Sequence, residues 1–184
     1  MSIRVTRPIV NPAYDRDLGQ AGMLAPVNSI STVNPTANLA YLLRFVPSRN
    51  MTITKIAFAV ITAAGSDDNV DVGIYNSDLS TKLVSTGDTA GLVNATTGTK
   101  TATVASTSLV AGTIYYVAFA YGTVGSTVAT LASAYLATTG VSTIFGSSPP
   151  QLLQGTKTAS HPLPSSIATP TSVANSPLLA LRES

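Results

Sequence analysis

The chain of 184 residues suits one domain, and its apolar fraction of 45% is too high for a protein that is disordered throughout. Charged residues make up only 10% of the sequence, and the net charge of +2 is too weak to indicate a nucleic-acid partner. There is no cysteine, which excludes disulfides and thiolate chemistry, and no apolar run approaches the roughly 20 residues of a membrane span, so we expect no membrane partner.

The first 26 residues are predicted to form an extended arm. Pro8, Pro12 and Pro26 interrupt any regular element, and the segment has no apolar run typical of a signal peptide. Because its apolar side chains are too scattered to build a core, we expect the arm to run across a neighbouring protein, where many small contacts offset its ordering. The side chains expected to make that contact are three apolar anchors and three arginines suited to acidic partners: Ile3, Ile9, Tyr14, Arg4, Arg7 and Arg16.

The body, residues 27–184, is predicted to begin with a strand over 38–47 that is apolar on both faces. The stretch 51–78 follows, and we take it as the element around which the body is organised. Apolar side chains alternate with other residues on both sides of a polar turn at 63–69, as expected of two strands with one buried face each. We therefore predict a β-hairpin here.

The rest of the body is predicted to consist of short strands and loops. Strands are expected at 82–85, 99–106, 114–121, 128–136 and 177–183, and the proline-rich segment 138–174 is expected to be a loop. No segment has the caps and the 3.6-residue period of a helix.

This succession of strands and turns indicates an all-β fold. We predict an antiparallel β-sandwich with jelly-roll or Greek-key wiring and an extended N-terminal arm. In 114–121, either Tyr116 and its neighbours or Val117 and Phe119 could face the core, and we place Val117 and Phe119 inward because Phe119 has more apolar area to bury. The side chains expected between the two sheets are Ile56, Phe58, Val60, Val72, Ile74, Val117 and Phe119.

The one local group of carboxylates is Asp67, Asp68 and Asp71. Three aspartates could supply part of a Ca²⁺ site, which needs six to eight oxygen ligands. Asp71, however, alternates with Val70 and Val72, which places it on the outer face of a strand. We therefore expect a solvated turn and no metal.

Catalysis has little titratable material in this sequence. His161 is the sole histidine and lies in a proline-rich loop without a nucleophile elbow, and Glu183 is the sole glutamate. Glycoside hydrolysis would need a pair of carboxylates in a cleft. We expect no enzyme and no cofactor.

A cluster of aromatic residues lies in the strand predicted at 114–121. Tyr115, Tyr116, Phe119 and Tyr121 could form a platform on which a sugar stacks, but neighbouring residues of a strand face opposite sides. Core and interface packing is the interpretation that we favour.

No charged residue or histidine occurs between Lys100 and Lys157. Either the outer face of this segment meets another protein, or it is a surface solvated by Ser and Thr hydroxyls. We predict that 101–156 contributes to an interface between identical subunits, in a homotrimer.

The segment 38–78 resembles a β-sandwich domain of bacteriophage virion proteins, found in head-decoration, tail-fibre and tail-tip components. The matching residues are Tyr41, Phe45, Pro47, Thr52, Ile56, Ala63-Ala64-Gly65-Ser66 and Gly73-Ile74-Tyr75. Leu109 to Ala118, with Tyr116 at the aromatic position, is similar to a later strand of that domain, and PLLALRE is similar to its last strand. The resemblance covers about residues 30–183, but not the arm, and the usual Trp of the later strand is missing here.

The resemblance implies a protein of the virion. We expect a capsid decoration or cement protein, since a short body with a clamp-like arm suits that role and the chain has no long shaft. Its partners would be further copies of itself, in a homotrimer, and the major capsid protein or other virion proteins. The alternative is a tail-tip or tail-fibre module that recognises glycans of the host surface.

Overall fold

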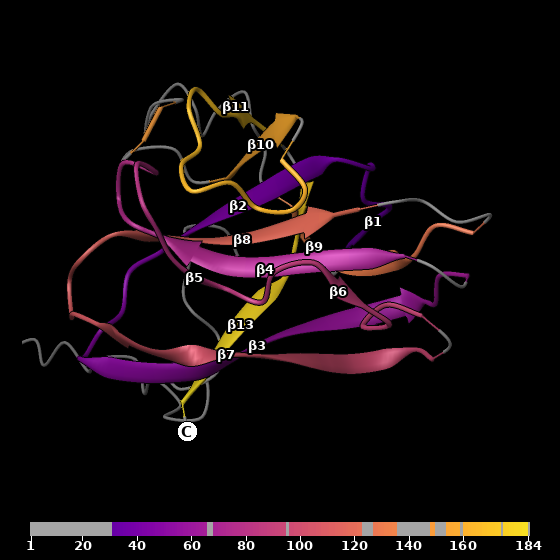
Figure 1. The fold of residues 1–184 in the computed structure, drawn as a ribbon, viewed down its shortest axis with the longest axis horizontal. Helices are drawn as coiled ribbons and strands as arrows, with labels where there is room; N and C mark the ends of the chain where they lie inside the picture. The colour runs from indigo at the N-terminus through magenta and orange to yellow at the C-terminus, as the bar shows by residue number, and fades with distance from the viewer. Residues whose placement is uncertain are drawn as a thin grey trace, which may run out of the picture.

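The computed structural model contains two antiparallel sheets packed face to face, and every regular element in its described residues is a β-strand (Figure 1). The predicted β-sandwich is therefore confirmed. The arm, with Ile3, Arg4, Arg7, Ile9, Tyr14 and Arg16, lies outside the described residues. The structure describes residues 31–65, 68–94, 96–122, 127–135, 148–149, 154–158, 160–173 and 175–183.

The first sheet is built around the long strand β3. One edge of β3 pairs with β7, and the other edge pairs first with β13 and then with β9. β9 in turn pairs with β1 and β12. The strands are β1 (Ser31–Val33), β3 (Met51–Thr62), β7 (Gly98–Leu109), β9 (Thr130–Tyr135), β12 (Asn175–Pro177) and β13 (Leu179–Glu183).

The second sheet has the order β11-β10-β2-β8-β4-β5, with β6 paired to β4. Most neighbours in this sheet are not consecutive in the sequence, as in Greek-key wiring. Figure 1 shows β2, β8 and β4 layered above β3 and β7. The strands are β2 (Leu39–Phe45), β4 (Asn69–Tyr75), β5 (Lys82–Ser85), β6 (Thr89–Ala90), β8 (Tyr115–Tyr121), β10 (Gln154–Thr158) and β11 (Thr171–Ser172).

The predicted hairpin at 51–78 is wrong, because β3 and β4 belong to different sheets. The chain leaves β3 and crosses to the second sheet, and the crossing is held by hydrogen bonds from the Ala64 amide to the Val93 carbonyl and from the Gly65 amide to the Thr127 carbonyl. Alternation reveals that each strand buries one face, but two strands that face each other across a core give the same pattern as two that pair edge to edge.

The predicted core is confirmed. The seven side chains expected between the sheets are all at most 3% exposed and belong to one apolar cluster. Phe58 of β3 and Phe119 of β8 meet edge to face, with ring centroids 5.3 Å apart. Val117 lies in the same cluster, whereas Tyr116 belongs to a second one, so β8 is oriented as predicted.

A β-bulge in β3 sets which of its side chains face outward. The register with β7 shifts between Ile53 and Lys55, so Ile53 and Ile56 both point into the core although they are three residues apart. Lys55 is thereby exposed on the outer face, directly opposite Arg182 of β13.

The segment predicted as a loop, 138–174, contains two strands, which is a second correction. β10 pairs with β2 over five residues, and β11 pairs with β10. The β10 sequence, QGTKT, has no apolar alternation, because the ladder to β2 is made by backbone groups that every residue carries.

Candidate functional site

The outer face of the second sheet is covered by residues 160–167, which we call the strap. Leu163 and Ile167 of the strap are buried against the outward side chains of β4 and β8, and Leu79 joins them in the second apolar cluster. Both faces of β8 are therefore buried, and all seven of its residues are shielded from solvent.

Asp71 anchors the strap to β4. Its carboxylate is fully buried, and its Oδ2 accepts a hydrogen bond of 2.9 Å from the Leu163 amide. The hydroxyl of Thr86 donates to Oδ1 at 3.2 Å, and that of Ser85 donates to Oδ2 at 3.4 Å. The sequence places Asp71 correctly on the outer face of its strand, but the expectation that solvent covers it is wrong.

Further hydrogen bonds tie the strap to the rest of the sandwich, among them one of 2.8 Å from the Lys82 amide to the Ser165 carbonyl. The Tyr75 hydroxyl donates to the Pro164 carbonyl at 2.5 Å, and the Lys82 ammonium donates to the Leu163 carbonyl at 2.6 Å. The Ile167 amide donates to the Leu79 carbonyl at 2.9 Å. Burial, and next the charge of Asp71, raises the pKa of Tyr75 above its ordinary value.

Asp68 is also buried, and it lies at the opposite end of β4 from Tyr75. It accepts a hydrogen bond from the Tyr121 hydroxyl, and the same hydroxyl oxygen accepts one of 3.1 Å from the Ala129 amide. Burial, and next the bond to Asp68, raises the pKa of Tyr121. The solvated turn expected at the aspartates is thus wrong for Asp68 too, whereas Asp67 lies outside the described residues. Over the described ranges, no three potential ligands among His, Cys, Asp and Glu are grouped to hold a metal ion.

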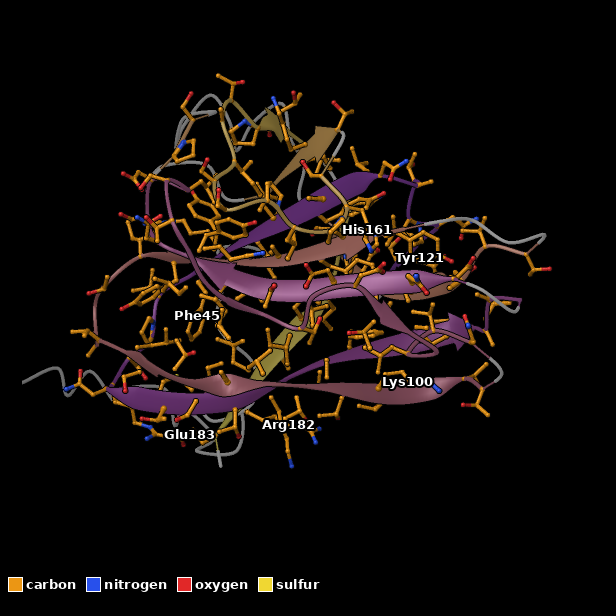
Figure 2. All side chains as sticks on the ribbon, viewed as in Figure 1. Phe45, Lys100, Tyr121, His161, Arg182 and Glu183 are labelled. Atoms are coloured by element: carbon orange, nitrogen blue, oxygen red, sulfur yellow. The ribbon has the colours of Figure 1, made fainter. Side chains whose placement is uncertain are left out.

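His161 is nearly buried. Its side chain is 7% exposed, and its Nε2 lies 3.5 Å from Oδ1 of Asp88. The ring occupies the space beside Gly122, where an added Cβ would approach the imidazole to 2.6 Å. This packing gives His161 a role in seating the strap (Figure 2).

The aromatic residues of β8 form core, as we favoured, and not a platform for sugars. Tyr115, Tyr116, Phe119 and Tyr121 are each at most 7% exposed. Burial raises the pKa of Tyr116, in the same sense as for Tyr75 and Tyr121. The same burial explains why β8 has no charged residue.

One described part of the uncharged segment is exposed, at the end of β7 in the first sheet. We call five exposed residues at the end of β7 and in the turn after it the β7 patch: Ala105, Ser106, Ser108, Val110 and Ala111. Val110 is 55% exposed. Beside it lies an open cavity of about 630 Å³, lined by Asn50, Met51, Thr52, Ser108, Leu109, Val110 and Glu183. These groups suit contact with another surface better than catalysis, because Glu183 is the single titratable group in the lining and it is paired with Arg49.

The sequence matches no family model and no curated protein. In the part of the chain that the structure describes, no helix is long and apolar enough to cross a membrane.

Proposed function

We propose that this protein is a structural component of a bacteriophage virion: a capsid decoration, or minor capsid, protein that binds the surface of the particle. The proposal starts from the resemblance of residues 30–183 to the phage virion domain. It is supported by the places that the matching residues take in the sandwich. Tyr41 and Phe45 of β2, Ile56 of β3 and Ile74 of β4 all lie in the core between the sheets.

The triplet Gly73-Ile74-Tyr75 is the observation that carries the proposal furthest. Ile74 faces the core, and Tyr75 faces the strap. Gly73 has no room for a side chain, because an added Cβ would lie 2.5 Å from the Val84 carbonyl oxygen and 2.8 Å from Cβ of Ser85. Each position of the triplet is thus constrained by a different neighbour.

We assign contact between copies of the protein, in a homotrimer, to the β7 patch. Its side chains are uncharged, as the cores of stable interfaces tend to be. Val110 offers an apolar anchor, and the adjoining cavity offers a place for an anchor from a partner. The arm then serves the contact with the major capsid protein, through Ile3, Ile9 and Tyr14 and through the three arginines.

The test is to locate the protein on phage particles. Gold-labelled antibodies raised against the purified protein should decorate the heads of particles at regular spacing. Labelling confined to the tail tip or the fibres would refute decoration and favour the glycan-binding alternative. A chain that lacks residues 2–25 should keep the circular dichroism of the sandwich and fail to bind particles that lack the protein.

A further inference from the structure

Leu83 is a large apolar side chain that a β-bulge exposes at the edge of the second sheet. The register of β5 with β4 shifts between Lys82 and Val84, which leaves Leu83 as the extra residue of the bulge. Its side chain is 41% exposed, whereas Val84 packs against the core. Because bulges re-aim side chains, a leucine is presented here to the surroundings of the molecule.

The backbone on both sides of this bulge is fixed by hydrogen bonds. Before the bulge, the Lys82 amide donates to the Ser165 carbonyl at 2.8 Å, and the Lys82 ammonium donates to the Leu163 carbonyl at 2.6 Å. After it, the Thr86 amide donates to the Val72 carbonyl at 2.9 Å. An apolar side chain on a fixed backbone loses little freedom when it enters a partner, which favours its use as an anchor.

The cavity beside the β7 patch has the size and the lining to receive such an anchor. Its volume is about 630 Å³, and Met51, Leu109 and Val110 give its wall an apolar part. Cavities of this size accommodate groups much larger than one leucine side chain. A leucine from a neighbouring molecule can therefore enter the cavity together with part of the chain that carries it.

The charges near the cavity and near Leu83 are complementary. Lys55 of β3 and Arg182 of β13 are directly opposite each other in the antiparallel register, and Nε of Arg182 has no hydrogen-bond partner among the described residues. Figure 2 shows Arg182 along the same lower margin of the molecule as Glu183, which lines the cavity. The turn that leads into β5 carries Asp78, which is exposed and forms no ion pair within the described part of the chain. Opposite charges on two surfaces steer their association and fix its orientation.

We propose that Leu83 of one copy docks in the cavity of the next copy, where Asp78 faces Lys55 and Arg182. The inference rests on the homotrimer proposed above, and it names the surface that meets the β7 patch and its cavity. Leu83 belongs to the second sheet and the cavity to the first, so each copy presents a different surface to each of its two neighbours. Such heterologous contacts generate a ring when the rotation between copies closes.

The first experiment is cross-linking of the full-length protein, whose sequence contains no cysteine of its own. In L83C/S108C, one thiol replaces the anchor and the other lies in the lining of the cavity, so a short bismaleimide should join them between copies. We expect covalent dimers and trimers, with the trimer as the largest product. L83C alone, S108C alone and I61C/S108C, which has its first thiol at another exposed apolar position, should give little product. Cross-links confined to single chains, or a product that stops at the dimer, would overturn the proposal.

A second experiment tests the contact by sedimentation of charge-reversed variants. K55E and D78K should each raise the concentration at which the trimer dissociates by at least about 5-fold, and K55E/D78K should recover most of that loss. L83D should dissociate the trimer, because it places a charge in the cavity of the next copy. A trimer that tolerates both single reversals and L83D would overturn this inference and leave the homotrimer standing. A wild-type protein that sediments as a monomer at micromolar concentration would overturn both.

Discussion

The anchoring of the strap by Asp71 leads to a prediction that separates a local role from a global one. Replacing Asp71 by Val introduces a β-branched residue, which strands favour, and removes the acceptor of the Leu163 amide. The buried amide then has no partner, and Ser85 and Thr86 lose the same carboxylate. Asp71→Asn is the matched control, because its amide oxygen can still accept from Leu163.

The expected loss follows from the balance of two effects. A hydrogen bond to a charged acceptor contributes about 1.5–3 kcal/mol, and an unsatisfied buried amide costs about 1–3 kcal/mol. Removing the carboxylate also removes the cost of burying it, which three donors already offset in large part. We expect a net loss of about 2 kcal/mol for Asp71→Val, which corresponds to a fall of about 4–8 °C in melting temperature. The Asn variant should lose less than half of this.

Hydrogen exchange gives the decisive measurement. The Ile167 amide bonds the Leu79 carbonyl and has no contact with Asp71, so its exchange reports opening of the strap and not the lost bond. A loss of about 2 kcal/mol predicts exchange about 30-fold faster at Ile167. The Leu178 amide, bonded to the Ala132 carbonyl in the first sheet, should accelerate less than the Ile167 amide. Unchanged exchange at Ile167 in Asp71→Val would refute the idea that Asp71 holds the strap.

Two further predictions concern the tyrosines and the β7 patch. Burial raises the pKa values of Tyr75, Tyr116 and Tyr121 above 10.0, so above about pH 10 the unfolded chain loses protons that the folded chain keeps. The free energy of unfolding should therefore fall as the pH rises above about 10, and it should fall less steeply in Tyr75→Phe. Denaturant titrations at pH 8–11 measure this pH dependence, and an equal dependence in the two proteins would contradict the prediction. In sedimentation, Val110→Asp should shift the protein toward the monomer. The control is Ile61→Asp, which changes a similarly exposed apolar residue outside the uncharged segment and should leave the oligomeric state unchanged. The same oligomeric state in both variants would show that the β7 patch is not the interface.

The sequence predicts which faces are buried more reliably than which strands are neighbours. Alternation in β3, β4 and β8 identifies the inward side chains, because burial of apolar area acts on each strand separately. Pairing depends on contacts between distant segments, and nothing in the local pattern distinguishes the crossing after β3 from a hairpin turn. The bulge has a visible signal, since Ile53 and Ile56 break the period of two.

The strap could not be predicted from the sequence for a related reason. Asp71 and Leu163 are 92 positions apart, and the strap has no repeating pattern to show that it covers a sheet. A hint existed in β2 and β8, whose outward side chains are apolar and require a cover. A similar hint exists in β4. Asp71 is the single charged residue of this strand, whereas a strand face exposed to solvent would more often carry several polar residues.

The two outer faces of the sandwich therefore differ in their exposure to solvent, and this difference affects where a partner can bind. The second sheet is covered by the strap, and the side chains of Asp71, Tyr75 and Lys82 form hydrogen bonds to the backbone of the strap. The first sheet presents Thr101 and Thr103 to solvent beside Lys55 and Arg182. Since complementary charge steers association, an acidic surface should approach the first sheet.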